Sequence, residues 1–175
     1  YSELKNLKGY IIFTQHFKNE VFVHVQLEGL PEGIHGFHIH EHEITADIIK
    51  KLNNGIKIKN VCNTLGGHFN PYNSNHGSYR LNTERHAGDL INNLFIDKSG
   101  KIKISFFDPL ISLDKNDINC ILNRSIVIHE THDDEGILGL NALKNKKKLN
   151  KNEEESLKTG NAGKRIACGN IILLE

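Results

Sequence analysis

The sequence is short of cysteine, of long apolar runs and of excess charge of either sign, and each shortage argues against a class of protein. Its three cysteines include no Cys-x-x-Cys pair, which argues against a zinc ribbon and against a thioredoxin-type redox site. No apolar run approaches the roughly 20 residues that a membrane-spanning helix needs. Lysine and arginine (22) balance aspartate and glutamate (21), so the net charge of +1 gives no reason to expect nucleic acid or an acidic membrane as a partner.

The composition fits one ordinary globular domain. With 175 residues, of which 38% are hydrophobic and 25% charged, the chain can bury a core, and we expect a single domain over residues 1–175. No signal-peptide pattern is visible, so we expect a cytoplasmic location, although a chain that opens on Tyr1 gives that expectation little weight. Reduced thiols are the default for a cytoplasmic protein.

Short segments in which apolar and polar residues alternate dominate the chain. Residues 21–27 and 101–106 alternate in the way expected of half-buried strands. Turn signals at residues 31–33 and 97–100 separate such segments. Many short strands with few helical patterns predict an antiparallel sandwich or barrel. Further candidate strands are residues 9–15, 34–40, 90–96, 125–130 and 166–174.

Two stretches depart from the strand pattern. Residues 43–55 place isoleucine and leucine at helical spacing, with Thr45 as a candidate N-cap and an Asn-Asn-Gly stop at 53–55, which predicts a short helix within a long loop. Residues 141–155 contain five lysines, three glutamates and few apolar residues. That composition predicts a solvated loop without a folded element.

Histidine supplies the clearest functional signal. His38 and His40 are two residues apart, so on a strand both imidazoles point to one face and can reach one metal ion. His129 ends another strand-like segment, and turn-rich sequence adds further candidates: His68, His76, His86 and Asp89. Neutral imidazole binds copper and zinc, and one carboxylate among nitrogens is a common zinc set, so these seven residues predict a two-metal centre. The other histidines are expected to be surface or structural residues: His16, His24, His35, His42 and His132.

The motifs that carry these residues occur in a recognisable order. They are GFHIHE (36–41), GGHFNP (66–71), ERHAGDL (84–90), IVIHETHDD (126–134) and TGNAGKRIACG (159–169). From about Gly9 to the C-terminus the chain closely resembles the copper/zinc superoxide dismutase family. The resemblance implies an all-β fold, an eight-stranded antiparallel Greek-key barrel or sandwich with long metal-site and electrostatic loops, whose first strand is truncated here.

The resemblance also implies the ligands of the two metals. Four residues match copper ligands: His38, His40, His68 and His129. Four match zinc ligands: His68, His76, His86 and Asp89. His68 belongs to both sets, as an imidazolate that bridges copper and zinc.

Residues around the metals match family roles as well. Asp133 matches a carboxylate that links ligands of the two metals, and such a group fixes the orientation of the imidazoles. Arg165 matches the arginine that docks superoxide, and Lys158 is expected to help attract it. Cys62 and Cys168 match the family's intramolecular disulfide. A structural ion pair between Arg85 and Asp108 is also implied.

Two insertions depart from the family pattern. One, at residues 41–61, lies in a loop that helps form the family's homodimer, so it argues against the homodimer that the resemblance otherwise implies. The other, at residues 141–152, places lysines in the loop that steers the substrate. These lysines could add to steering, but exposed charges are screened beyond about 8 Å at physiological salt.

The reaction implied by the resemblance is the disproportionation of superoxide to oxygen and hydrogen peroxide by Cu(II)/Cu(I) cycling. Arg165 and His68 are the expected catalytic residues, His68 supplying a proton while zinc holds it in place. Two alternatives stay open at this stage. The first is a non-catalytic copper- and zinc-binding homologue that buffers metal or binds a partner. The second is a zinc-only hydrolase, which would need an open coordination position on zinc.

Overall fold

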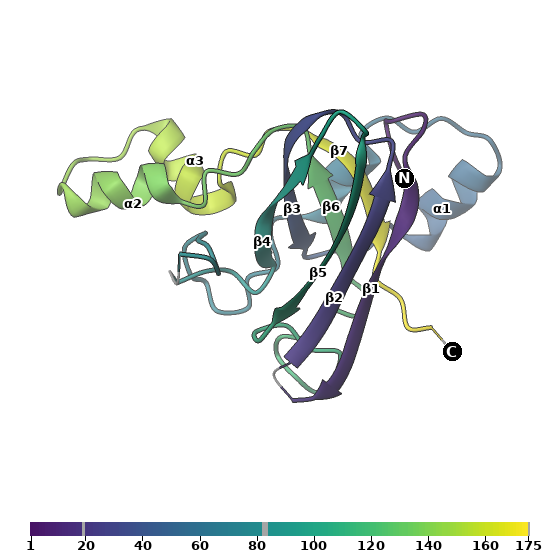
Figure 1. Ribbon diagram of the computed structural model, residues 1–175, viewed down its shortest axis with the longest axis horizontal. Helices are drawn as coiled ribbons and strands as arrows, with labels where there is room; N and C mark the ends of the chain where they lie inside the picture. Colours follow the sequence, from purple (N-terminus) through teal and green to yellow (C-terminus); the bar gives the residue numbers. More distant parts are fainter. Residues whose placement is uncertain (19, 82–83, 175) are drawn as a thin grey trace.

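The alternating segments fold into seven strands within the residues that the structure, a computed structural model, describes, namely 1–18, 20–81 and 84–174 (Figure 1). The strands form two antiparallel sheets. The first has the order β1-β2-β5, with β1 (Lys8–Phe17), β2 (Glu20–Glu28) and β5 (Lys101–Asp108). The second has the order β4-β3-β6-β7, with β4 (Asp89–Ile96), β3 (Gly33–His40), β6 (Ser125–His129) and β7 (Arg165–Asn170).

The core lies between the two sheets. In β2 every second side chain is buried, including Val21, Val23 and Val25. These valines belong to the same apolar cluster as Phe37 and Ile39 of β3, in the other sheet. Burying each such side chain stabilises the fold by roughly 1.5–3 kcal/mol. The period-2 pattern of the sequence therefore determines which face of each sheet packs inward.

The expected fold class is confirmed, and in the described part of the chain one seam between the two sheets is not joined by a strand ladder. At this seam, residues 1–3 pair with the outer edge of β7, through a bridge between Ser2 and Ala167 and two backbone hydrogen bonds between Tyr1 and Cys168 (2.8 and 2.9 Å). Within the described residues, β1 and β7 are not paired with each other. A largely apolar groove of about 840 Å³ lies there, between residues 8–13 and 167–174.

The helix predicted within residues 43–55 is present as α1 (Ala46–Asn53). The side chain of Thr45 accepts a hydrogen bond from the backbone N–H of Ile48, as the N-cap prediction required (3.5 Å). A 3₁₀ helix, η1 (Val61–Leu65), follows and packs its buried side chains with Ile44 in a second small core.

The prediction that residues 141–155 form a solvated loop is wrong. The segment contributes to two helices, α2 (Ile137–Lys144) and α3 (Lys151–Thr159), which form a hairpin that projects from the sandwich (Figure 1). A capping box between Asn150 and Glu153 begins α3, and Gly139 of α2 packs closely against Leu157 of α3. The prediction rested on the number of charged and apolar residues alone. The hairpin is instead stabilised by helix caps and by one close contact between the two helices, which such numbers do not reveal.

Candidate metal centre

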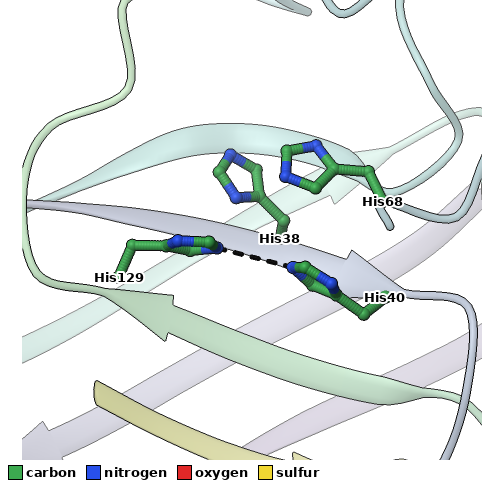
Figure 2. Close-up of side chains that lie close together, drawn as sticks. All are labelled: His38, His40, His68 and His129. Carbon is green, nitrogen blue, oxygen red and sulfur yellow. Dashed lines mark hydrogen bonds between the residues drawn. The ribbon is translucent and has the colours of Figure 1, made fainter. Parts of the chain in front are cut away.

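Neighbouring strands bring three of the candidate ligands together. β3 and β6 pair antiparallel, so that His38 lies opposite Val127 and His40 opposite Ser125. His129 ends β6, and Figure 2 shows its ring beside those of His38 and His40. All three histidines are buried. The two-residue spacing of the HxH motif thus places both rings on one face of β3, as predicted.

His40 and His129 face each other through nitrogen atoms that carry no proton. The Nδ1 atom of His40 donates to the carbonyl of Gly66 (3.1 Å), and Nδ1 of His129 donates to the carbonyl of Gly163 (3.2 Å). Their Nε2 atoms are therefore lone-pair acceptors. These two atoms lie 3.4 Å apart, joined by the dashed line in Figure 2. Two lone pairs so close repel each other, and a shared cation would replace that repulsion with attraction.

His38 and His68 complete this first group. The Nε2 atom of His38 lies 2.6 Å from a carboxylate oxygen of Asp133, and Nδ1 of His68 lies 2.7 Å from one of Asp89. Their other ring nitrogens, Nδ1 of His38 and Nε2 of His68, are buried and have no hydrogen-bond partner in the described part of the chain. Buried polar atoms rarely lack a partner. Each of the four rings offers a nitrogen within 4.8 Å of the others, so the group fits a metal ion.

Burial keeps these imidazoles neutral, which is the ligand form. Burial and the nearby ring of His38 lower the pKa of His68 to about 3, and burial with His68 lowers that of His129 to about 3. Burial also holds the pKa values of His38 and His40 well below the usual range for histidine. Neutral imidazole suits copper and zinc, so in this group only His68, whose two nitrogens would serve both metals, would need to lose a proton.

A second group shares His68 with the first and gathers around Asp89, the first residue of β4. One oxygen of this carboxylate lies 2.7 Å from Nδ1 of His68 and 3.2 Å from Nδ1 of His86, and the other lies 2.9 Å from Nδ1 of His76. The contact with His76 lacks hydrogen-bond geometry, since that Nδ1 atom is without a hydrogen-bond partner among the described residues. The ligand atoms again lie within 4.8 Å of one another, and one carboxylate with three imidazoles is a common zinc set.

The charge of Asp89 dominates the electrostatics of this second group. Burial lowers the pKa of His76, but the carboxylates of Asp89 and Asp133 outweigh burial and raise it to about 10. Burial raises the pKa of Asp89, but the surrounding histidines, with His76 first, hold it well below its usual range. Without a metal, His76 therefore carries a proton at the place where a cation would bind.

Asp133 connects the two groups. One of its oxygens accepts a hydrogen bond from Nε2 of His38 (2.6 Å) and the other from Nε2 of His76 (2.9 Å). The side-chain oxygen of Asn93 accepts from the backbone N–H of Asp133 and so fixes the position of the carboxylate (2.8 Å). Since Asp133 engages Nε2 of both histidines, it turns their Nδ1 atoms toward the first and second groups respectively.

A cavity of about 270 Å³ gives access to the first group. Three histidines of the first group, His40, His68 and His129, line the cavity together with Arg165, the first residue of β7. The remaining lining residues are Glu155, Thr159, Asn161, Ala162 and Gly163. Lys158, expected to attract substrate, lies in the last turn of α3 and is not among them, whereas the acidic Glu155 is.

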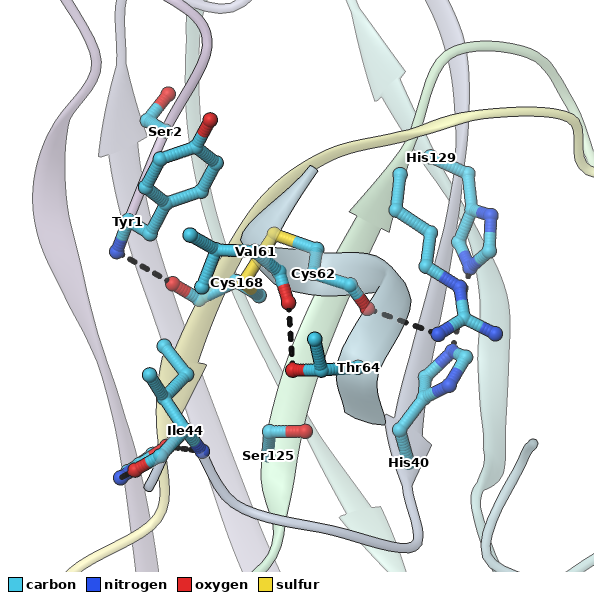
Figure 3. Close-up of a disulfide and its surroundings, with 12 residues drawn as sticks. Tyr1, Ser2, His40, Ile44, Val61, Cys62, Thr64, Ser125, His129 and Cys168 are labelled. Atoms are coloured by element: carbon cyan, nitrogen blue, oxygen red, sulfur yellow. Dashed lines mark hydrogen bonds between the residues drawn. A yellow bond between two sulfur atoms is a disulfide. The ribbon is translucent and has the colours of Figure 1, made fainter. Parts of the chain in front are cut away.

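A disulfide fixes the wall of this cavity. Cys62 of η1 and Cys168 of β7 are bonded across 106 residues of sequence, as the resemblance implied (Figure 3). Cys120 is free. The guanidinium group of Arg165 donates to the carbonyls of Cys62 (2.8 Å) and Gly66 (2.7 Å). The bridge therefore holds the carbonyl groups that orient Arg165.

Comparison with known proteins agrees with this geometry. The model of the copper/zinc superoxide dismutase family matches residues 7–171. The chain belongs to this family. Superoxide dismutase [Cu-Zn] A of Xenopus laevis is 39% identical over 95% of this chain and 89% of its own length. Extracellular superoxide dismutase [Cu-Zn] of Drosophila melanogaster is 41% identical over 97% of this chain and 78% of its own.

A solved structure has the same architecture as this chain. The crystal structure of the clock protein EA4 superposes with a TM-score of 0.73 at 34% identity, covering 97% of this chain and 89% of that one. The chain and the clock protein EA4 thus share both sequence and architecture. The implied ion pair between Arg85 and Asp108 is also present and buried, with Nη2 of Arg85 lying 3.0 Å from both carboxylate oxygens.

The structure brings together all seven candidate ligands, with Asp133 and Arg165 beside them. Sequence reasoning missed Glu155 at the cavity and an ion pair between Arg80 and Glu135. Glu135 follows Asp133 by only two residues, and this closeness to a carboxylate of the site was the signal in the sequence that could have pointed to Glu135. His35, expected to be surface or structural, is buried and lies within hydrogen-bond distance of the carbonyls of Pro31 and His129, which is a structural role.

Proposed function

We propose that residues 1–175 form one superoxide dismutase domain that converts two superoxide anions and two protons to oxygen and hydrogen peroxide. Copper would be held by His38, His40, His68 and His129, and zinc by His68, His76, His86 and Asp89. The observation that carries this assignment is the position of His68. One of its nitrogens belongs to each group of ligand atoms, so a single imidazole can couple the two metals.

Copper, when bound, supplies the one-electron chemistry, accepting an electron from one superoxide and giving it to another. The chain supplies attraction and a proton. Arg165 lines the same cavity as His40, His68 and His129, so its guanidinium group can draw the anion to the reacting site. His68 takes up a proton at Nε2, the atom that has no hydrogen-bond partner among the described residues, and passes it to the reduced substrate. Its Nδ1 atom stays with the second group throughout.

The second group and Asp133 act by positioning. Zinc at this group would neutralise Asp89 and lower the pKa of His68 as a neighbouring cation does. Asp133 orients His38 and His76 at once, so a change in either ligand set is felt by the other. Zinc with four protein ligands has no open position for hydrolysis, so the second group supports a structural role rather than a hydrolase.

The test combines metal analysis with superoxide consumption. We expect the purified chain to hold copper and zinc in equal amounts and to consume superoxide. His129→Ala should lose copper and activity but keep zinc, since His129 belongs only to the first group. The matched control is His16→Ala, because His16 is an exposed histidine of β1. Zinc alone, with no activity after copper loading, would contradict the assignment and support a non-catalytic metal-binding protein.

The assembly and location follow as predictions. We infer a homodimer in the cytoplasm, and the insertion at residues 41–61, which contains α1, is the feature that argues against the dimer. Relatives from Drosophila melanogaster and Brugia pahangi are named as extracellular. No helix among the described residues is long and apolar enough to span a membrane. Sedimentation of the full chain tests the dimer, and fractionation of cells tests the compartment.

A further inference from the structure

The loop that carries His76 is held against the segment after β6. The backbone N–H of His76 donates to the carbonyl of Leu157 in α3 (2.7 Å). Gly136 lies so close to the carbonyl oxygen of His76 that an added Cβ would be 2.6 Å from it, and its φ of +74° also favours glycine. The α2–α3 hairpin and the residues before it therefore form one wall of the second metal site.

An ion pair joins the same two segments, the loop of His76 and the segment after β6, at a point farther along the loop. Nη2 of Arg80 lies 3.0 Å from Oε1 of Glu135. The two partners differ in burial, because the Glu135 side chain is 7% exposed and that of Arg80 is 67% exposed. The other carboxylate oxygen of Glu135 is buried without a hydrogen-bond partner in the part of the chain that is described. Arg80 thus covers a carboxylate that has little other stabilisation.

Glu135 is connected to the ligands through its backbone. Its N–H donates to Oδ1 of Asp133 (2.5 Å), the same oxygen that accepts from Nε2 of His76 (2.9 Å). Displacing Glu135 would therefore withdraw one of the donors that hold Asp133, and Asp133 would orient His76 less firmly. Arg80 is thus connected to His76 in two ways. One is the series of contacts through Glu135 and Asp133, and the other is the backbone of the loop that carries both Arg80 and His76.

We propose that Arg80 and Glu135 form a latch that closes the loop of His76 over the second group and slows release of the zinc ion. Both are positioning residues, because they act through Asp133 and the loop and do not contact the ligand atoms. The proposal rests on the zinc assignment above. A buried carboxylate that loses its cation must either rotate toward water or stay buried at a high cost. Either change loosens the contact between the loop of His76 and Glu135, and lets zinc leave faster.

The experiment measures the rate of zinc transfer from the holoenzyme to a chromogenic chelator in excess. In Arg80→Gln the rate should rise about tenfold, between the small effect of losing a surface pair and the larger effect of stranding a buried charge. Arg80→Lys keeps the cation and should retain most of the slow release. The matched control is Lys101→Gln, which removes an exposed pair with Glu28 at 3.6 Å, remote from the metal ligands, and should leave the rate unchanged.

A double-mutant comparison separates a latch from general loosening. Glu135→Gln replaces the carboxylate with a neutral amide that needs no cation, so Arg80→Gln should add little to its effect. High salt should speed zinc release from the wild type, because it screens the attraction between the exposed Arg80 cation and Glu135. It should leave Arg80→Gln nearly unchanged, because that variant has no ion pair left to screen. Effects that simply add, or a wild-type rate in Arg80→Gln, would overturn the latch. A wild-type chain that binds no zinc would instead overturn the proposed function, so the two failures are distinguishable.

Discussion

Single hydrogen bonds, from backbone carbonyls or from one carboxylate, decide which nitrogen of each imidazole is free for a metal. Backbone carbonyls take the Nδ1 protons of His40 and His129, whereas Asp133 engages Nε2 of His38 and of His76. Each histidine therefore has one ring nitrogen committed to a protein partner and the other turned inward. Such partners raise the basicity of the ligand and fix the orientation of its ring, so that their loss lowers metal affinity by roughly 10–100-fold.

The pKa shifts predict how the metal-free protein responds to pH. For His68 and His129, the folded pKa of about 3 lies below the ordinary 6.5 of histidine, so the stability they support is present above pH 6.5 and lost as the pH falls toward 3. For His76, the folded pKa of about 10 lies above 6.5, so its contribution is present below 6.5 and lost as the pH rises through 10. Denaturant unfolding in chelator should show highest stability near pH 6.5.

Zinc provides the control for this pH dependence. When it replaces the proton on His76, the loss of stability on the alkaline side should largely disappear, because the cation that balances Asp89 no longer titrates. Metal-free stability that keeps rising above pH 6.5 would contradict the charge state inferred for His76.

At the scale of elements, strands hold part of the site and loops hold the rest. β3, β6 and the start of β4 fix four of the ligands by register, and such positions follow from alternation in the sequence. His68, His76 and His86 lie in irregular segments, where no periodicity predicts a position. The α2–α3 hairpin supports this irregular part through the contact between Leu157 and His76.

This division explains how far the sequence could predict the molecule. The strands and α1 were predicted, since alternation and the Thr45 cap are local signals. The gathering of all seven ligands was also predicted, because motif order and family resemblance carry it. The α2–α3 hairpin was not predicted, because the local capping box of Asn150 and Glu153 was overlooked and because Gly139 against Leu157 and Ser156 donating to Asp134 (2.9 Å) are contacts between distant residues. The latch was missed for the second of these reasons.

The N-cap of α3 offers a test of the hairpin. The side chain of Asn150 accepts from the backbone N–H groups of Asn152 (2.9 Å) and Glu153 (3.1 Å). Asn150→Ala should cost about 1 kcal/mol of local stability, so fraying of α3 should increase by several-fold in amide exchange. Exchange in β2 should not change, and the exposed Lys147→Ala serves as the control. Equal protection of α3 in both variants would show that the capping box contributes nothing.

At the scale of the whole molecule, one covalent bond joins the loop of η1 to β7 near the cavity. Because the Cys62–Cys168 bridge spans 106 residues, it removes much of the freedom of the unfolded chain. It also lies beside the carbonyls that hold Arg165. Stability and substrate attraction therefore depend on the same bond.

Removing this bridge should lower both properties together. The chain-entropy model gives roughly 4–5 kcal/mol of stabilisation for a loop of this length, so Cys168→Ser should lower the melting temperature markedly. Activity should fall through weaker substrate attraction, since Arg165 loses its fixed acceptors. The control is Cys120→Ser, which removes the free thiol. An unchanged melting temperature and activity in Cys168→Ser would show that the bridge is irrelevant.

The groove between β1 and β7 has a consequence for how the sandwich moves. Along most of that seam the facing edges are not joined by a strand ladder, and only residues 1–3 extend β7 there. Water can therefore solvate the outer amides of β1 without separating any paired strand. One edge of this seam is β7, which begins with Arg165 and pairs with β6, the strand that ends at His129, so opening of the seam borders the cavity and not only the outer edge of β1.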